Sequence, residues 1–521
     1  MKPLEQPNPQ TAKSRLPLHL RPNYKWLVVG MLWWMCFFNY ADRQAVTAVF
    51  PLLERDMHLN KVQMGMIGAA FALVYGLFAP FAGSVGDLFA RKKVILWGLW
   101  LWSAICYATG LARNYTQLLV FRAAEGLGET FYFPATTSFL SDYHDKRTRS
   151  RALGLHNTGV YTGVIGGSVF AGLISTHYGW GSSFKIFGVL GILLGLVLMR
   201  FIVEPKRGAA DRAEAGLAEK GSATTSEAPR PSPLPGGEGA RRLPRVALAM
   251  VAYAACVCGG AAAGYLVGRL VGFDLAAGNV PVSAFIGALP GIAVGLPLAL
   301  YINQGQAGLD FLRWVVRTPT VLVLMLCFMC ANFVALVAMS WMPKFLYDKF
   351  SWDLAQAALM ATIFINLSNM LGAPLGGLFA DLLRRRTAGG RMIVQACAML
   401  LAAPFVYLTG FTHAVALLVV GLAGWGLLKG MYDANIFASA FDFIPPQMRG
   451  SAAGVMNMAG WLGAFPAPIL VGYLAEQTSL SLAIASASSV YVLGALLMMV
   501  GVLAFARRDA ARMGLALAKQ E

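Results

Sequence analysis

Charged side chains inside apolar segments are the residues with which this chain could do chemistry. Asp42 and Arg43 follow Asn39 and Tyr40 well inside an apolar segment near residues 26–51. Charged groups are costly in the apolar part of a membrane, so such residues are functional candidates. An adjacent acid and base partly neutralise each other, and an arriving carboxylate or proton would change that balance. The alternative is a structural ion pair that holds this segment to a neighbour.

A second group of charges lies in the apolar segment near 116–140. Arg122, Glu125 and Glu129 stand at i, i+3 and i+7, so a helix would present all three on one face. Two turns, roughly 10 Å along the axis, separate Arg122 from Glu129. Burial disfavours the charged form of a carboxyl group, and a carboxyl that gains and loses a proton is what proton coupling requires. We expect Glu129 to do this with Arg122 bracing it; the alternative is a static Arg–Glu pair.

Further polar side chains could contact a solute. Lys429 and Asp433 are four residues apart and are predicted to pair on a helix, either as a substrate contact or as a structural pair. Amide and phenol groups could donate hydrogen bonds to a polyol or a sugar acid, although each taken alone is more often a helix–helix contact. His156 is expected to be structural. The candidate substrate-binding residues are Arg43, Arg122, Tyr75, Tyr132, Tyr161, Asn157, Asn366, Lys429 and Asn435.

The composition predicts a membrane protein made of helices. Of the 521 residues, 57% are hydrophobic and 13% are charged, and the mean hydropathy is +0.59. Soluble chains carry about 25% charged residues. The apolar segments have the length that a helix needs to cross a bilayer, and they lack the alternating pattern of membrane strands. The net charge of +17 lies in short loops between these segments, which favours a membrane over nucleic acid as the partner.

The order of the apolar segments predicts seven regions and fourteen spans in an all-α polytopic fold. Two sets of six spans form the N-terminal and C-terminal bundles, and two extra spans lie between them. The segment before the extra spans is rich in Ala, Gly, Pro, Ser and charge, which is typical of disorder. The predicted regions are a tail at 1–25 without a signal peptide, a bundle at 26–204, a disordered linker at 205–245, extra helices at 246–303, a connector at 304–318, a bundle at 319–506 and a tail at 507–521.

Two repeated motifs indicate that the bundles arose by duplication. One loop motif has Gly83, Asp87 and Arg91 in the first half and Gly377, Asp381 and Arg385 in the second, at one constant offset. We expect these six residues to form a cytoplasmic gate that opens in one conformation and closes in the other. A further set repeats at a second constant offset and pairs Asp142, Arg149, Ala152, Gly154, Asn157 and Gly163 with Asp442, Arg449, Ala452, Gly454, Asn457 and Gly463.

Loop charge predicts the orientation, and glycine spacing predicts how the extra helices pack. Lys and Arg cluster in alternate loops, which places both termini in the cytoplasm of a plasma-membrane protein. Glycines recur every four residues at 260–272 and 287–295, so smooth helix faces can approach closely. The extra pair either binds a partner or packs on itself and the bundles. There is no phosphate-binding GxxxxGK[ST] loop and no HExxH or Ser–His–Asp arrangement, so we expect neither ATP drive, an enzyme, a cofactor nor a metal.

At these motifs the sequence resembles the major facilitator superfamily, outside 205–318. The doubled G-x-x-x-D-x-x-x-R-[KR] loop carries the resemblance, although Leu88 and Ala90 depart from the usual family residues. N-Y-x-D-R in the first span, and R-x-x-x-G-x-G-E followed by Phe133-Pro134-Ala135, are similar to the anion:cation symporter group, which imports hexuronates, galactonate and related acids. The spinster group of lysolipid transporters shares the Asp-Arg and Gly-Glu signatures and is the alternative.

The resemblance implies a fold, a function and roles. Two six-helix bundles would carry a small organic anion together with protons by alternating access, as a monomer. Asp42 and Glu129 would be the proton sites, and Arg43 and Arg122 would be the cations that balance their charge. A protein of another functional class, a receptor with the same fold that does not transport, is a further alternative. The presence of Asp42, Arg43 and Glu129 argues against it, because a receptor would not need these charged residues inside the membrane.

Overall fold

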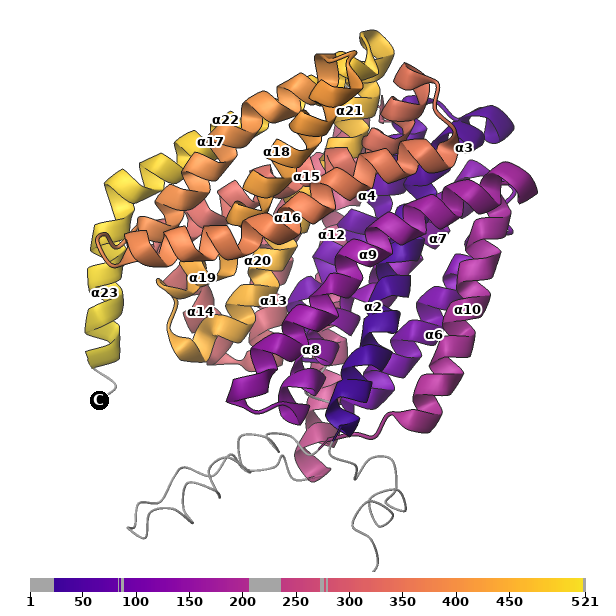
Figure 1. The fold of residues 1–521 in the computed structure, drawn as a ribbon. Helices are drawn as coiled ribbons and strands as arrows, with labels where there is room; N and C mark the ends of the chain where they lie inside the picture. Colours follow the sequence, from indigo (N-terminus) through magenta and orange to yellow (C-terminus); the bar gives the residue numbers. More distant parts are fainter. Residues whose placement is uncertain are drawn as a thin grey trace, which may run out of the picture.

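The structure is almost entirely helical. It is a computed structural model that describes residues 23–82, 84–85, 89–205, 236–271, 276–277 and 280–518. In this part of the chain the only strands are β1 (Ala276–Ala277) and β2 (Val280–Pro281), which pair antiparallel. Figure 1 shows the helices of the first half, indigo to magenta, beside those of the second half, orange to yellow.

The N-terminal bundle runs from α2 to α10. Polar N-caps mark several helix starts, because their side chains accept hydrogen bonds from otherwise unpaired backbone N–H groups. Asn60 forms a capping box with Gln63, and Asn114 and Asp145 accept from Gln117 and Thr148. The elements are α2 (Tyr24–Ala48), α3 (Phe50–Met57), α4 (Lys61–Phe78), η2 (Ala79–Phe81), α6 (Arg91–Thr109), α7 (Tyr115–Thr130), α8 (Tyr132–Tyr143), α9 (Lys146–Tyr178) and α10 (Trp180–Phe201).

The C-terminal bundle repeats this arrangement. α15 packs on α20 as α2 packs on α9, α16 on α18 as α4 on α7, and α17 on α22 as α6 on α10. The two halves therefore share one packing plan, as the repeated motifs predict. The elements are α15 (Pro319–Phe350), α16 (Leu354–Arg384), α17 (Gly390–Phe411), α18 (Val415–Asp433), α19 (Ile436–Phe441), η3 (Pro446–Met448), α20 (Arg449–Ala464), α21 (Pro466–Gln477), α22 (Leu480–Gly501), η4 (Val502–Ala506) and α23 (Arg507–Ala518).

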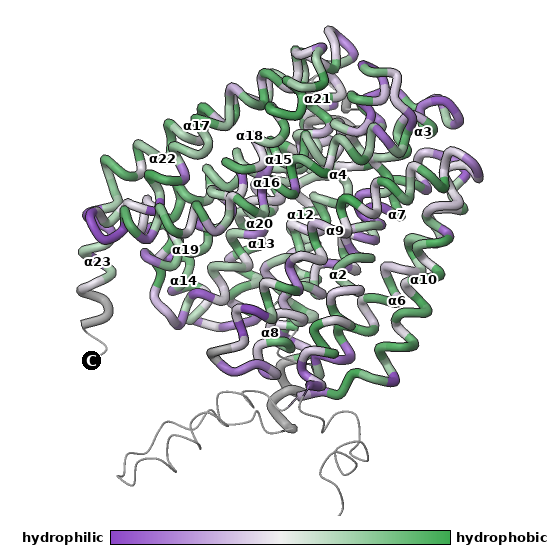
Figure 2. The backbone as a smooth tube through the Cα atoms, viewed as in Figure 1, coloured by the Kyte–Doolittle hydropathy of each residue, from purple (hydrophilic) through white to green (hydrophobic). Residues whose placement is uncertain are grey.

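Long apolar helices make up most of the described chain. Eleven segments in it are long and apolar enough to cross a membrane. The helices that do not meet that measure include α2 and α7, which contain the charges of the candidate site, and α6, which opens on Arg91-Lys92-Lys93. Figure 2 shows green, apolar stretches along α6, α10, α17 and α22, with purple loops at their ends. The helical membrane fold is confirmed, and the number fourteen stays a prediction.

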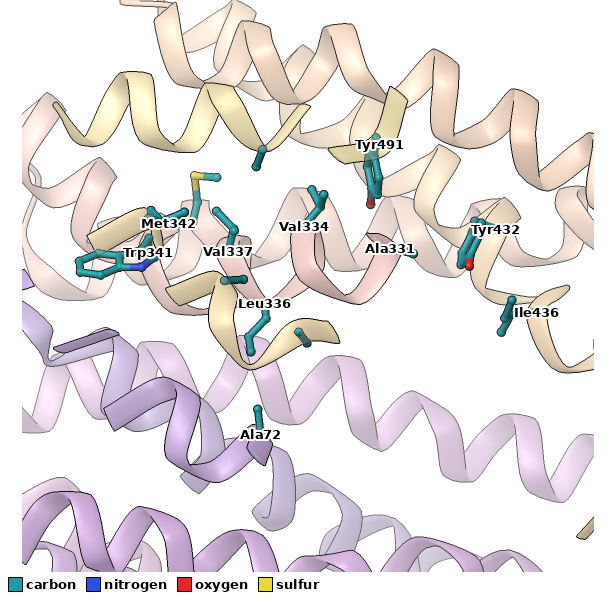
Figure 3. Packing of buried hydrophobic residues seen from close by; sticks show 14 of the residues in the cluster. Ala72, Ala331, Val334, Leu336, Val337, Trp341, Met342, Tyr432, Ile436 and Tyr491 are labelled. Atoms are coloured by element: carbon teal, nitrogen blue, oxygen red, sulfur yellow. The ribbon is translucent and has the colours of Figure 1, made fainter. Parts of the chain in front are cut away.

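The buried core joins the two bundles. Val334, Val337 and Trp341 lie along one face of α15 and are fully or almost fully buried. Figure 3 shows them in a row along α15, with Tyr491 and Tyr432 of the C-terminal bundle beyond the Val334 end of the row and Ala72 of α4 opposite. The indole N–H of Trp341 donates to the Pro468 carbonyl at 3.0 Å, which satisfies its only polar group.

The extra helices form a close hairpin. α12 (Gly236–Val271) packs along α13 (Val282–Gln304), and α14 (Gln306–Arg317) follows. A Cβ on Gly264 would lie 2.6 Å from the Gly287 Cα, so only glycine allows this approach. The self-packing interpretation is therefore supported. α12 begins at Gly236, inside the segment expected to be disordered; residues 206–235 lie outside the described part.

The hairpin also touches both bundles. The Tyr253 ring lies 5.7 Å from that of Phe81 beside α4, and its hydroxyl donates to the Met458 sulfur of α20 at 3.4 Å. Asn303 donates to Ser84, and Ser451 donates to Gln304. The hairpin therefore lies along the seam between α4 and α20.

Deleting 208–303 and rejoining the halves with a flexible linker is expected to leave measurable transport. The repeat is complete without the hairpin, and removing two spans keeps the direction of the later ones. The loss of the seam contacts should lower the melting temperature of the purified protein. Uptake by cells that express the deletion variant is the measurement. Complete loss of transport in a variant that inserts and folds normally would assign the hairpin an essential role.

The charge distribution predicts which end of the molecule faces the cytoplasm. We call the end where α6, α9, α17 and α20 begin the basic end, and the end where α4, α7, α16 and α18 begin the opposite end. In a background without the seven native cysteines, an impermeant thiol reagent added to intact cells should label cysteine placed at Arg113 or His413. Cysteine at Arg147 or Arg386 should react only after the membrane is opened. Labelling of the Arg147 position in intact cells would reverse the orientation.

Candidate functional site

A polar cavity lies between the two bundles. Its volume is about 290 Å³, and α2 and α9 on one side and α15, α16, α18 and α20 on the other supply its walls. It therefore has the position that a solute-binding site shared by two repeats requires. The polar and aromatic residues of the lining are Tyr40, Arg43, Gln44, Tyr161, Asn332, Thr362, Asn366, Asn369, Trp425, Lys429, Asp433 and Trp461.

Arg43 is the cation of the N-terminal wall. Its Nε donates to Oε2 of Glu129 at 3.1 Å, and its Nη2 donates to the same oxygen and to Asn39. The guanidinium carbon lies 4.5 Å from the ring centroids of both Tyr40 and Phe71, within the range of a cation–π contact. Arg43 is only 5% exposed, so the structure holds it firmly between one carboxylate and two aromatic faces.

Two buried carboxyl oxygens beside Arg43 are unsatisfied. Among the described residues, no hydrogen-bond donor reaches Oε1 of Glu129 or Oδ1 of Asp42. Buried polar atoms normally have a partner, and a proton on the carboxyl group would reduce the cost of burying it. Both residues lie where the sequence predicts proton sites, one on each side of the contact between α2 and α7.

Arg122 does not brace Glu129, and this expectation is wrong. Arg122 pairs with Glu125, one turn along α7, and donates to the Arg43 carbonyl at 3.3 Å. Two helical turns separate it from Glu129, whereas Arg43 approaches Glu129 directly from α2. Each arginine therefore pairs with the carboxylate nearer to it, Arg122 with Glu125 and Arg43 with Glu129.

One group of side chains in this bundle has the spacing of metal ligands. Asp42, Cys106 and Glu125 bring one ligand atom each within 4.8 Å of one another. Glu125 is already paired with Arg122, which leaves one carboxylate and one thiol. That is fewer donors than zinc or calcium sites use.

The C-terminal wall carries a second ion pair. Lys429 pairs with Asp433 one turn further along α18, which confirms the predicted pairing. The Asn369 amide of α16 donates to Asp433 at 3.2 Å, and the Tyr161 hydroxyl of α9 donates to the Asn369 oxygen at 3.4 Å. This chain of hydrogen bonds connects the two bundles across the cavity.

The structure brings four of the nine candidate substrate-binding residues into the lining: Arg43, Tyr161, Asn366 and Lys429. Tyr75 is not in the lining but contacts it, with its ring centroid 4.9 Å from that of the lining residue Trp461. Tyr132 contacts His156 at 3.1 Å inside the bundle, Asn157 is exposed, and Asn435 donates to the Met431 carbonyl. These three residues and Arg122 lie outside the lining.

Gln44 and Trp461 are among the lining residues that were not predicted. Gln44 donates to the Met339 carbonyl of α15 at 2.9 Å and so bridges the bundles, and Trp461 of α20 lies 5.8 Å from the Arg43 guanidinium. Gln44 could have been predicted from the sequence, because it directly follows Arg43. Nothing in the sequence marks Trp461 as a lining residue, because it reaches the site only through packing of α20 against α4.

The two bundles have equivalent ion pairs at the basic end. Arg91 pairs with Asp142, and Arg391 pairs with Asp442 at 3.2 Å. Each arginine also donates to a backbone carbonyl at corresponding positions, Ser138 and Ala438.

The counterpart of Arg91 is therefore Arg391, and matching it to Arg385 is wrong. Asp381 pairs with Arg391 at 2.9 Å, and Asp442 also pairs with Arg384 at 3.0 Å, while Arg385 is exposed. The longer loop before α17 shifts the repeat offset between the two motifs. Partial burial raises the pKa of Asp442, and the neighbouring Arg391 opposes this rise. Gly83 and Asp87 lie outside the described residues, and a Cβ on Gly377 would have no neighbouring atom within 4 Å.

The bundles are in direct contact at the opposite end. Lys344 of α15 is almost fully buried and pairs with Glu54 of α3 at 2.6 Å and with Asp348 at 2.8 Å. A Cβ on Gly65 of α4 would lie 2.4 Å from the Pro468 carbonyl oxygen. These contacts hold the two bundles together at the opposite end.

Two repeated bundles around a central polar cavity, with ion pairs between helices at both ends, define a secondary membrane transporter. The chain matches the Major Facilitator Superfamily over residues 32–468 and 321–520 and belongs to that family. The resemblance predicted from the loop motifs is confirmed.

The similar proteins include several carriers of organic acids. The probable galactarate/D-glucarate transporter GudP of Bacillus subtilis (strain 168) is 20% identical over 89% of each chain. The hexuronate transporter of the same organism is 20% identical, over 84% of this chain and 85% of that one. The 4-hydroxybenzoate transporter PcaK of Pseudomonas putida is 31% identical over a shorter stretch, 35% of this chain and 41% of that one.

A solved structure has the same fold. A bacterial homolog of the human lysosomal transporter Spinster, in an inward-facing and unoccupied conformation, has a TM-score of 0.62 at 18% identity. The match covers 94% of this chain and 98% of that one.

Proposed function

We propose that this membrane transporter moves a small organic anion, such as a sugar acid, in symport with protons. The Arg43–Glu129 pair on the cavity wall supports this proposal most directly. A guanidinium can bind a carboxylate through two parallel hydrogen bonds, and in this structure the Nε and Nη2 of Arg43 both donate to a single carboxylate oxygen, Oε2 of Glu129. A substrate carboxylate would compete with Glu129 for Arg43.

This competition would couple the substrate to protons. A Glu129 carboxylate displaced from Arg43 would be a buried, uncompensated charge, which is strongly unfavourable. Protonation removes that charge, so substrate binding and proton uptake at Glu129 favour each other. Asp42, whose Oδ1 is unsatisfied beside it, is the second proposed proton site.

Alternating access would use the ion pairs at the two ends. In this structure Lys344 and its partners close the opposite end. We propose that these pairs break when the cavity opens there, and that the Arg91 and Arg391 groups at the basic end then bring the bundles together. The protein would work as a monomer in the cell membrane, with both termini in the cytoplasm.

The polar lining favours a soluble acid over a lysolipid. Amide and hydroxyl groups of Asn332, Asn366 and Tyr161 suit a polyol chain, and a cavity of about 290 Å³ is small for an amphiphile with a long tail. The names of GudP and the hexuronate transporter agree with this preference. The Spinster-like fold keeps an amphiphile as the alternative cargo, because the fold alone does not select the substrate.

A ligand-stabilisation screen tests the proposal. The purified protein should gain melting temperature with sugar acids or other small carboxylates, because a ligand that binds only the folded state stabilises it. Neutral sugars of the same size are the control and should have no effect. Stabilisation by lysolipids alone would support the alternative.

A further inference from the structure

A second cation faces the same cavity from the other bundle. Lys429 of α18 and Arg43 of α2 both line it, and each is neutralised by a carboxylate of its own bundle, Asp433 and Glu129. Each wall of the cavity in the described chain therefore presents one cation that is paired with a carboxylate of its own bundle.

The Lys429 pair is more accessible than the Arg43 pair. The side chains of Lys429 and Asp433 are 21% and 38% exposed, against 5% for Arg43. The groups around it from other helices are neutral: Asn369 of α16, Tyr161 of α9 and Tyr491 of α22. Within the described chain, Asp433 is thus the one carboxylate that neutralises Lys429, as Glu129 neutralises Arg43.

We propose that the cargo is a dianion whose two acidic ends bind Arg43 and Lys429, one in each bundle. This inference rests on the proposed function. A monoanion would engage Arg43 and leave the Lys429–Asp433 pair intact. A dianion would make a charge-assisted contact with both bundles and so favour the state in which they close around it. Asn332 and Asn366 line the same cavity and would bind the polar middle of the cargo.

The charge balance then sets the number of protons. Each substrate carboxylate replaces one protein carboxylate, Glu129 or Asp433, and each displaced group takes up one proton from the solution on the side from which the substrate enters. No covalent bond forms or breaks apart from these protonations. A dianion enters with two protons and a monoanion with one, so in both cases the net charge of the cavity is unchanged.

Paired ligands test this inference on the full-length protein. Galactarate and galactonate differ in one terminal carboxylate, and succinate and succinamate differ in the same way. By calorimetry, the diacid of at least one pair should bind about tenfold to a hundredfold more tightly, the value of one charge-assisted hydrogen bond. Titration in buffers of different ionisation enthalpy should show two protons taken up with the diacid and one with the monoacid.

Substitution of the second cation gives the matched comparison. Lys429→Gln should remove the advantage of the diacid and lower the affinity for the monoacid by a smaller factor, because Asp433 loses its partner. Lys349→Gln removes the same charge from the C-terminal bundle outside the cavity and should alter neither affinity. Lys429→Gln combined with Asp433→Asn, which leaves no unpaired charge, should also remove the advantage of the diacid if the single variant is unstable.

Different outcomes would overturn the dianion inference and the proposed function. Equal affinity for diacid and monoacid, or an equal loss of both in Lys429→Gln, would overturn the dianion inference and leave the anion site at Arg43 standing. Absence of binding by every acid in the stabilisation screen would overturn the proposed function and this inference with it.

Discussion

Replacing Glu129 with glutamine is expected to abolish accumulation driven by a pH gradient while preserving exchange of substrate for substrate. Glutamine imitates the protonated acid and cannot release a proton, so the variant would bind and carry substrate without coupling. It also frees Arg43 from its carboxylate partner. The measurement is uptake by proteoliposomes with an imposed pH gradient, compared with counterflow in the same preparation.

Glu125→Gln is the matched control. Glu125 is on the same helix, equally buried and also paired with an arginine, but its partner Arg122 is outside the cavity lining. This variant should still concentrate substrate if it folds. Concentrative uptake by Glu129→Gln would show that the coupling group is elsewhere.

Replacing Arg43 with lysine is expected to weaken binding of a carboxylate about tenfold to a hundredfold, although the positive charge is kept. Lysine cannot reproduce the planar fork that binds both carboxylate oxygens, and it loses the stacking on Tyr40 and Phe71. One charge-assisted hydrogen bond is worth about 1.5–3 kcal/mol. A binding isotherm for the best acid from the stabilisation screen, with wild type and variant, is the measurement.

The same substitution at Arg122 is the control. Arg122 pairs with Glu125 and does not line the cavity, so Arg122→Lys should change the affinity much less than Arg43→Lys. A lysolipid cargo predicts a different result, because contacts with its apolar tail would dominate and Arg43→Lys would matter little. Equal affinity of wild type and Arg43→Lys for a carboxylate would remove Arg43 from the binding site.

The architecture was predictable because its signals are local or repeated in the sequence. Apolar segments of membrane length give the helices, and the repeated Asp142 and Asp442 motifs give the duplication. Glycines four residues apart predict the close face of α12 and α13, since small side chains at that spacing share one side of a helix. The pairing of Lys429 with Asp433 is also predictable, because residues four apart lie on the same side of a helix.

Partners on different helices could not be predicted. Arg43 and Glu129 are 86 residues apart, and their contact depends on the rotation and depth of α2 against α7. The helical periodicity correctly places Arg122 and Glu129 on one face but does not reveal that another arginine is nearer. The assignment of Arg91 to Arg385 failed similarly, because the loop before α17 changes the offset that the motif comparison assumed to be constant.

Proteoliposomes loaded at one pH and diluted into another test the central claim most directly. With a proton gradient directed toward the substrate's destination, the purified protein should concentrate galactarate or another acid from the stabilisation screen above its external level. Collapse of the gradient with a protonophore should release it, and Glu129→Gln should only equilibrate it. Accumulation that is independent of the proton gradient, or transport of lysolipid without any acid, would contradict a proton-coupled organic-anion transporter.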